Sequence, residues 1–219
     1  MTMRRIEHGR VTLALRELGS APGPVLLAVH ALGGSGADWN EELAAWPGSV
    51  YAIDLTGHGE SEPLRGAGYS PELLAGDVDI AADAVGATHL VGRGLGSYLA
   101  LLVAGSRPEA IRGALLLPGR GLDGNDIVAF TNVSGRFESF RDAHIASGNG
   151  GPPPFLRILE SDVRPADYAH AFGVRANALF LAEDGSPRPS WWTALRDLNG
   201  ARSAPADMHA ALTELSLVR

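Results

Sequence analysis

The chain has 219 residues, no cysteine and a formal net charge of −7. A domain of this length buries roughly 70% of its unfolded surface, so it can form a core without disulfides or thiolate metal sites. The acidic balance argues against nucleic-acid binding, which needs Lys and Arg clustered on one face. All 18 basic residues are arginine, a bias typical of coding in a GC-rich bacterial genome.

The first twenty residues mix charged side chains into every apolar stretch, so they lack the apolar run of a secretory signal. No later segment approaches the roughly 18 uncharged apolar residues that a membrane span requires. We therefore expect a soluble, cytoplasmic protein that binds no membrane.

In the first half of the chain, short apolar runs alternate with helical patterns, which is typical of βαβ units and a mostly parallel sheet. A hairpin is expected first, with strands at residues 4–7 and 11–18. The elements expected after it are strand 24–30, helix 37–46, strand 50–54, helix 71–85, strand 88–91, helix 95–106 and strand 113–117. Ser70 before the helix and Pro71 at its first position favour helix initiation there.

The alternation fails over residues 118–175, where glycine and proline are dense and only residues 155–172 show helical periodicity. This segment is interpreted as an inserted lid, so that residues 1–117 and 176–219 form the core. The elements expected after the lid are strand 178–182, a helix around 191–198, a weak strand near 201–204 and a final helix from residue 205.

Three motifs stand at the carboxyl ends of expected strands: HALGGS at 30–35, DLTGHGES at 54–61 and GRGLG at 92–96. In order and spacing they resemble the H-G-x-x-G-S, D-x-x-G-x-G-x-S and G-x-S-x-G motifs of the α/β-hydrolase fold. The resemblance covers the whole chain except the lid. It implies a three-layer fold, with a mostly parallel sheet of about eight strands and helices on both faces.

The third motif departs from the family at its central residue, where Gly94 replaces the nucleophilic serine. In the family this residue is held in a strained conformation at a sharp strand-to-helix turn, which exposes the serine oxygen above the sheet. Glycine relieves the strain and removes the nucleophile. Serine esterase activity is therefore expected to be absent or very weak.

The resemblance also implies an oxyanion hole made of two backbone N–H groups. One belongs to Leu95, directly after the turn. The other belongs to Ala31 or Leu32, after the first buried strand, although the family has glycine where this chain has Ala31.

For the base, the resemblance points to His209, which follows the last expected strand, although Asp207 before it is expected to cap a helix. Asp184 is the expected orienting acid, about 25 residues before the histidine. Asp123, after the preceding strand, is the alternative acid. An alignment that puts Ser186 at this position, with the acid lost, stays open.

Residues around the turn could line a pocket: Arg93 beside the missing hydroxyl, Phe155 in the lid and Trp191 on the other side. Ser97, three residues after Gly94, is expected to satisfy a backbone N–H in the first helical turn rather than act as a displaced nucleophile.

The expected function is a pseudo-hydrolase that binds a small molecule, with no cofactor and no metal. One alternative is a serine-independent hydrolase, lyase or cofactor-free oxygenase with His209 as base. A glycine engineered in place of serine to trap a substrate is another. A third is dinucleotide binding by GRGLGS at 92–97, a weak match because Ser97 takes the third glycine position and no acidic residue follows the next strand.

Overall fold

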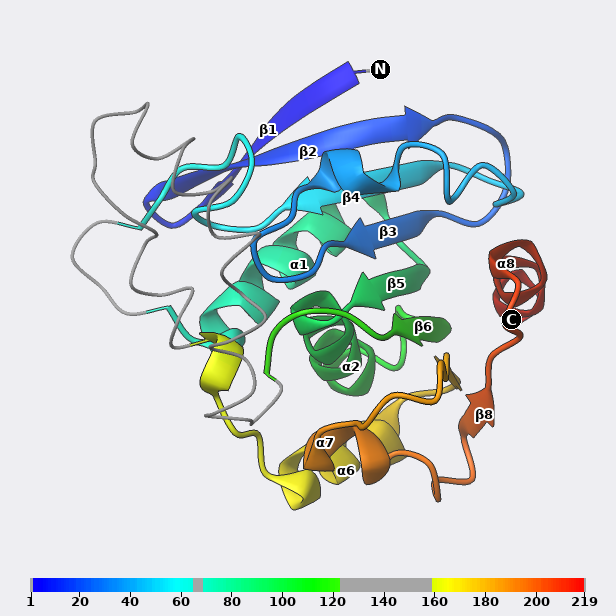
Figure 1. The fold of residues 1–219 in the computed structure, drawn as a ribbon. Helices are drawn as coiled ribbons and strands as arrows, with labels where there is room; N and C mark the ends of the chain where they lie inside the picture. The colour runs from blue at the N-terminus through cyan, green and yellow to red at the C-terminus, as the bar shows by residue number, and fades with distance from the viewer. Residues whose placement is uncertain (1, 65–68, 123–158, 219) are drawn as a thin grey trace.

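The structure is a computed structural model that describes residues 2–64, 69–122 and 159–218 (Figure 1). The described elements, in chain order, are β1 (Thr2–His8), β2 (Val11–Gly19), β3 (Leu26–Val29), the 3-10 helix η1 (Gly36–Trp39), β4 (Val50–Asp54), α1 (Pro71–Val85), β5 (His89–Arg93), α2 (Leu95–Ser106), β6 (Gly113–Leu117), α6 (Ala166–Arg175), β7 (Leu179–Leu181), α7 (Ser190–Thr193), β8 (Ala201–Ser203) and α8 (Met208–Ser216).

The strands form one sheet of eight in the order β1-β2-β4-β3-β5-β6-β7-β8. The hairpin β1–β2 and the pair β2–β4 are antiparallel, and all other neighbours are parallel. Every residue of β3, β4 and β6 is buried, as is usual for strands covered on both faces. The expected mostly parallel sheet of about eight strands is confirmed.

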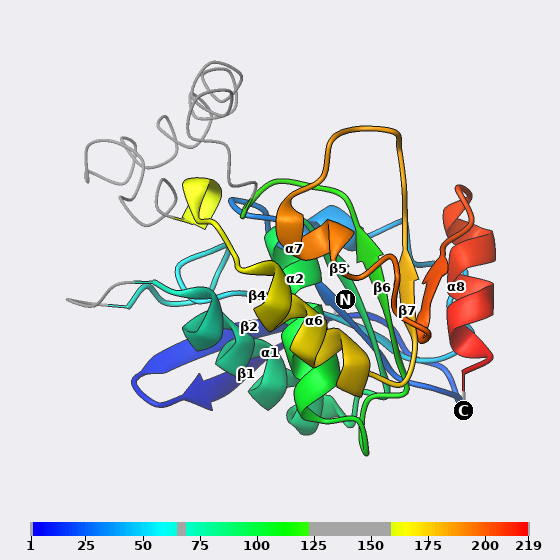
Figure 2. The same ribbon diagram turned by 90° about the horizontal axis from the view of Figure 1, so that it is seen from below.

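Helices cover both faces of this sheet, which confirms the three-layer architecture (Figures 1 and 2). One apolar cluster joins the sheet to α1 and α2, with Leu74 and Leu99 among its buried members. A second cluster lies on the opposite face, where Trp39 of η1 and Leu215 of α8 are buried against the strands. Because β3 to β8 run parallel, their carboxyl ends lie at the same edge of the sheet, between the two helical layers.

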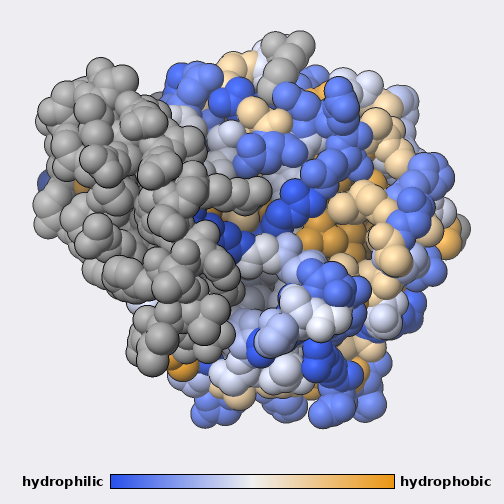
Figure 3. Space-filling model, viewed as in Figure 1, coloured by the Kyte–Doolittle hydropathy of each residue, from blue (hydrophilic) through white to orange (hydrophobic). Residues whose placement is uncertain are grey.

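The surface of the described residues is mainly hydrophilic on the face drawn in Figure 3, with an apolar area near its centre. Among the described residues, the exposed large hydrophobic side chains are Val163, Tyr168, Val174 and Leu217. Across the described ranges, no helix combines the length and the apolar character needed to cross a bilayer.

Helix α1 forms as expected over residues 71–85. Ser70 accepts a hydrogen bond from the N–H of Leu73, and Gly86 ends the helix with φ 66°. A left-handed residue at this position is most easily glycine, because it has no Cβ to collide with the backbone.

Three expected helices are wrong in extent: those over 37–46, 155–172 and 191–198. Residues 37–46 form η1 followed by turns, because their backbone bonds span three residues, as from Trp46 N–H to the Leu43 carbonyl (3.0 Å). The helix expected over 155–172 is interrupted: residues 159–161 are helical, residues 162–165 are not, and α6 starts after Pro165. Proline disfavours a helical conformation in the residue before it.

Helix α6, from the segment interpreted as a lid, packs on α2 in the helical layer. A Cβ on Gly105 of α2 would collide with the Phe172 carbonyl of α6, so the two backbones approach closely here. The helix expected around 191–198 is shorter, since α7 ends at Thr193 and turns follow.

Candidate functional site

The sharp turn between β5 and α2 carries Gly94, with φ 54° and ψ −115°. This is a backbone conformation that a residue with a side chain adopts only under strain. The neighbouring glycines are also required, because a Cβ on Gly92 would collide with the Gly96 carbonyl, and one on Gly96 with the Val29 carbonyl. The turn therefore keeps a backbone geometry that would strain a residue with a side chain, and Gly94 adopts it without that strain.

The backbone of Arg120 lies over this turn. A Cβ on Gly94 would collide with the Arg120 carbonyl oxygen and would lie 2.6 Å from the Arg120 nitrogen. The space into which a residue 94 side chain would project is thus filled by the segment that follows β6.

The same carbonyl occupies the expected oxyanion hole. The Arg120 oxygen accepts hydrogen bonds from the N–H of Leu95 (2.9 Å) and from the N–H of Leu32 (3.1 Å). Of the two residues expected after β3, Leu32 rather than Ala31 therefore points its N–H at this oxygen. Both donors are present, and both are used by the protein itself.

The segment that carries this carbonyl is fastened at several points. The Arg120 guanidinium pairs through Nε and Nη2 with both carboxylate oxygens of Glu160, at 2.7 and 2.9 Å. The Leu122 N–H donates to the Leu159 carbonyl (2.9 Å), and Trp191 Nε1 donates to the Leu122 carbonyl (3.1 Å). The Glu160 side chain is only 8% exposed, so this ion pair is largely shielded from solvent.

Arg93, expected beside the missing hydroxyl, is engaged elsewhere. Its guanidinium pairs with Glu42 and lies 4.7 Å from the centre of the Trp39 ring. A Cβ on Gly119 would lie 2.5 Å from Arg93 Cγ. The arginine therefore joins η1 to the segment that covers the turn.

Ser97 is fully buried and binds backbone groups. Its hydroxyl accepts from the N–H of Leu117 (3.0 Å) and lies 2.8 Å from the Gly92 carbonyl oxygen. The expected partner in its own first helical turn is wrong, since the N–H that Ser97 satisfies belongs to β6. The hydroxyl joins β5, α2 and β6.

The loop after β7 holds two acidic residues, neither of which is hydrogen-bonded or ion-paired to a histidine in the described ranges. Asp184 is exposed, and its carboxylate accepts from the N–H and hydroxyl of Ser186 and from Arg188. These hydrogen bonds lower the pKa of Asp184 to about 2. Glu183 is held by Arg196 at 2.9 and 3.0 Å, and also accepts from Trp192 Nε1.

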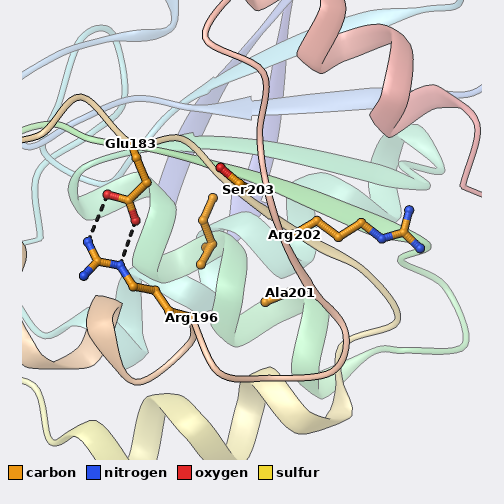
Figure 4. Close-up of a pocket in the computed structure, with 6 residues that line it drawn as sticks. Glu183, Arg196, Ala201, Arg202 and Ser203 are labelled. Atoms are coloured by element: carbon orange, nitrogen blue, oxygen red, sulfur yellow. Dashed lines mark hydrogen bonds and ion pairs between the residues drawn. The ribbon is translucent and has the colours of Figure 1, made fainter.

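A pocket of about 440 Å³ lies beside β7 and β8, lined by Leu181, Glu183, Arg196, Ala201, Arg202 and Ser203. Figure 4 shows the Glu183 carboxylate turned toward Arg196, with Ser203 on the neighbouring strand. No histidine from the described part of the chain lines this pocket. The loop acids thus serve as partners of arginines.

His209 lies exposed in the first turn of α8. Only residues 204–207 separate β8 from this helix, and Asp207 caps it by accepting from the N–H of Ala210 (2.8 Å). The His209 side chain makes no hydrogen bond or ion pair with any described residue. The structure does not bring His209 together with Asp184 or with the turn at Gly94.

Trp191 is buried, with its ring 5.0 Å from that of Tyr98 and 5.4 Å from that of Trp192. It supports the segment over the turn through the hydrogen bond to Leu122. The alternative acid Asp123 and the expected pocket residue Phe155 lie outside the described residues.

The first two motifs form a buried hydrogen-bonded loop system. Burial opposes ionisation of Asp54, but hydrogen bonds from Arg16 and from the N–H groups of Glu60 and Gly36 outweigh it and lower its pKa. Burial and the neighbouring His30, whose ring centre lies 4.9 Å from that of His58, lower the pKa of His58 to about 3.

In the described ranges, no group of three or more His, Asp or Glu residues is arranged to hold a metal ion.

Comparison with known proteins decides the family. Residues 25–216 match the model of the alpha/beta hydrolase family. The chain belongs to the alpha/beta hydrolase family. This match covers the sheet from β3 onward, and with it the turn at Gly94 and the Arg120 segment.

Relatives of this alpha/beta hydrolase family member are longer than the chain. It is 30% identical over 195 residues to 2-(acetamidomethylene)succinate hydrolase of Mesorhizobium japonicum, covering 85% of this chain and 64% of that protein. It is 34% identical over 127 residues to the dihydrolipoyllysine-residue acetyltransferase component of the acetoin cleaving system of Pseudomonas putida, covering 54% of this chain and 33% of that protein. The chain thus spans between a third and two thirds of these relatives.

Among solved structures, a bacterial membrane phospholipase A superposes with a TM-score of 0.70 at 17% identity, covering 99% of this chain and 81% of that one. This similarity supports the fold alone.

The sequence of this alpha/beta hydrolase family member does not predict the roles of Arg120 and Glu160 at the turn. Their only signal is the GRG sequence at 119–121, since glycines on both sides allow a backbone to approach closely.

Proposed function

We propose that this chain is a non-catalytic member of the alpha/beta hydrolase family, a pseudo-hydrolase that binds without turning over an ester. The observation that carries the proposal is the Arg120 carbonyl, which accepts hydrogen bonds from Leu95 and Leu32 above a turn that has no hydroxyl. Nucleophile and oxyanion hole are lost together.

Serine hydrolysis begins when a hydroxyl attacks a carbonyl whose oxygen is held by the oxyanion hole. Loss of the nucleophile lowers turnover on the order of a millionfold. Loss of one oxyanion donor lowers kcat about a hundredfold to a thousandfold. With both donors bound to Arg120, the residual catalysis that an empty oxyanion hole provides is also expected to be absent.

The placement of His209 supports this proposal over a serine-independent enzyme. A general base must lie within hydrogen-bond reach of the proton that it removes. His209 is exposed on α8 and has no orienting acid among the described residues. The proposal therefore assigns no base to this chain.

Dinucleotide binding at residues 92–97 is disfavoured by the hydrogen bonds at the start of α2. A phosphate at a helix start needs free backbone N–H groups. Here the N–H of Leu95 donates to Arg120 and that of Ser97 donates to Gly94.

The test uses the purified chain, a fluorophosphonate probe and p-nitrophenyl esters of several chain lengths. We expect no labelled serine, and ester hydrolysis equal to that of a His209→Ala control. An active serine esterase run in parallel verifies the reagents. Labelling of any serine, or turnover that His209→Ala removes, would contradict the proposal.

A further inference from the structure

The two ends of the sheet differ in the strand that each presents. β8, at one end, has three residues, whereas β1, at the other, has seven and pairs with β2 without a bulge. Among the described elements, none lies beyond β1 (Figure 1). β1 therefore presents a long, regular edge of backbone N–H and C=O groups, and such an edge is a template for a further strand.

The backbone groups of alternate residues of β1 point away from β2. Thr12, opposite Glu7, donates its N–H to the Glu62 carboxylate (2.9 Å) and accepts from the Glu62 N–H (3.0 Å). Ala14, opposite Arg5, donates its N–H to the loop after β4. Because opposed pairs in an antiparallel ladder alternate between hydrogen-bonded and non-hydrogen-bonded, the N–H and C=O groups of Arg5 and Glu7 point outward. In the described ranges, neither backbone is hydrogen-bonded outside the hairpin.

The charges of both signs on β1 limit how two copies could pair. A two-fold axis that joins two sheets edge to edge sets one residue of β1 opposite its own copy, since opposed side chains share a face. An axis at Arg4, Arg5 or Glu7 sets like charges directly opposite each other, which is destabilising. An axis at Ile6 sets two isoleucines opposite each other, and Arg5 opposite Glu7 of the second copy on both sides of the axis. Axes nearer the ends of β1 overlap only a few residues.

The register centred on Ile6 also satisfies the outward backbone groups. Each pair of Arg5 with Glu7 of the second copy exchanges both backbone hydrogen bonds, because these are the residues whose N–H and C=O point outward. Ile6 directs its backbone to β2 and forms the closer, non-hydrogen-bonded pair. Arg4 falls opposite His8 of the second copy, but Arg4 is paired with a glutamate of β2 and His8 with a buried carboxylate of α1.

We infer that β1 pairs with β1 of a second copy of this chain, antiparallel and centred on Ile6, so that the two eight-stranded sheets become one continuous sheet. Charged side chains commonly protect a sheet edge from pairing. On β1 they oppose the other registers that overlap most of the strand and favour this one. The inference is independent of the chemistry at Gly94, because β1 contributes no residue to that turn.

The experiment is sedimentation velocity of the purified chain over a series of concentrations, with circular dichroism to verify that each variant is folded. We expect a reversible equilibrium between monomer and dimer. Arg5→Glu sets like charges opposite each other at both pairs and is expected to raise the dimer dissociation constant by about 10-fold or more. The double variant Arg5→Glu/Glu7→Arg restores opposite charges in the same register, so its dissociation constant should return to within about 3-fold of the original.

Arg202→Glu is the matched control, because it makes the same charge reversal at an exposed arginine of β8, the opposite edge strand. It is expected to leave the dissociation constant unchanged. Arg5→Pro tests the backbone, since proline removes an outward N–H without removing a bond of the β1–β2 ladder. This variant is expected to abolish the dimer, and it keeps the test decisive if a charge variant does not fold.

A chain that stays monomeric at every concentration would overturn the inference. So would a dimer that survives Arg5→Pro, or a folded double variant that dissociates as readily as Arg5→Glu. A dimer weakened by Arg202→Glu and not by Arg5→Glu would place the interface at β8 and would also overturn it.

Discussion

Gly94 determines both the chemistry and the backbone of its turn. We expect Gly94→Ala to lower the free energy of unfolding by about 2 to 4 kcal/mol, since a strained backbone and overpacking against Arg120 add together. Urea unfolding followed by circular dichroism measures this change.

Gly86→Ala is the matched control. Gly86 also has positive φ, 66°, but nothing lies within 4 Å of its added Cβ, so only backbone strain of about 1 to 2 kcal/mol applies. If both variants lose the same stability, the Arg120 backbone does not crowd residue 94.

At the residue scale, the sequence reveals side chains but not the paths of loops. The missing hydroxyl at Gly94 is visible directly in the GRGLG motif. The Arg120 carbonyl is not, because every residue has a carbonyl and only the course of the chain after β6 brings this one over the turn. Chain order points to His209 as the base, but it does not show that the loop before α8 has only four residues, 204–207.

The Arg120–Glu160 ion pair joins the segment over the turn to the helical residues 159–161. Removing the carboxylate of a largely buried ion pair is costly, up to about 3 to 5 kcal/mol, because the remaining charge loses that partner in a site shielded from water. In Glu160→Gln, we expect hydrogen exchange at the Leu95 and Leu32 amides to become at least 10-fold faster, as the segment opens.

The amide of Ala28 in β3 reports whether the whole molecule has been destabilised. Glu42→Gln, which removes the partly exposed partner of Arg93, is the matched ion-pair control and should leave the Leu95 amide protected. Equal acceleration at Ala28 and Leu95 in Glu160→Gln would mean that the pair stabilises the fold in general and does not close the site.

Elements with complete local signals could be predicted closely. Helix α1 has its serine cap, its first-position proline and its terminal glycine, and its bounds match the expectation. In the segment 37–46, the buried side chains recur at helical spacing, but the backbone forms a 3-10 helix and turns. The spacing of buried side chains alone does not distinguish an α-helix from these tighter turns. The helix expected over 155–172 is interrupted at Pro165, a signal that was present in the sequence.

At the scale of the whole molecule, stability depends on pH because burial lowers the pKa of three described histidines: His30, His58 and His89. Burial and the neighbouring His30 lower the pKa of His58 to about 3, and burial lowers the pKa of His30. The unfolded chain takes up protons on these groups near pH 6.5, whereas folded His58 does so only near pH 3. Stability is therefore fully present above pH 6.5 and is lost as the pH falls toward 3.

The slope of this loss is about 1.4 kcal/mol per pH unit for each histidine that stays neutral in the folded state. His58→Gln is expected to reduce the slope between pH 6 and 4 by about one proton, measured by urea unfolding at a series of pH values. The same substitution at the exposed His170 is the control. An unchanged slope in His58→Gln would show that this histidine is protonated in the folded protein.

The three-layer fold and the family could be inferred from the sequence, because the three glycine-containing motifs follow apolar strands in the same order and at the same spacing as in the α/β-hydrolase fold. The activity could not, since it depends on whether a few backbone groups remain free at one edge of the sheet. Fold and function are separate inferences, and here they rest on different residues.

The most direct measurement of the central claim is fluorophosphonate labelling of Gly94→Ser, after circular dichroism has shown that the variant is folded. The account predicts no labelling and no ester hydrolysis, because no histidine of the described residues is placed to activate the restored hydroxyl, even where the added side chain displaces the Arg120 carbonyl. Stoichiometric labelling of Ser at position 94, with restored ester turnover, would contradict it.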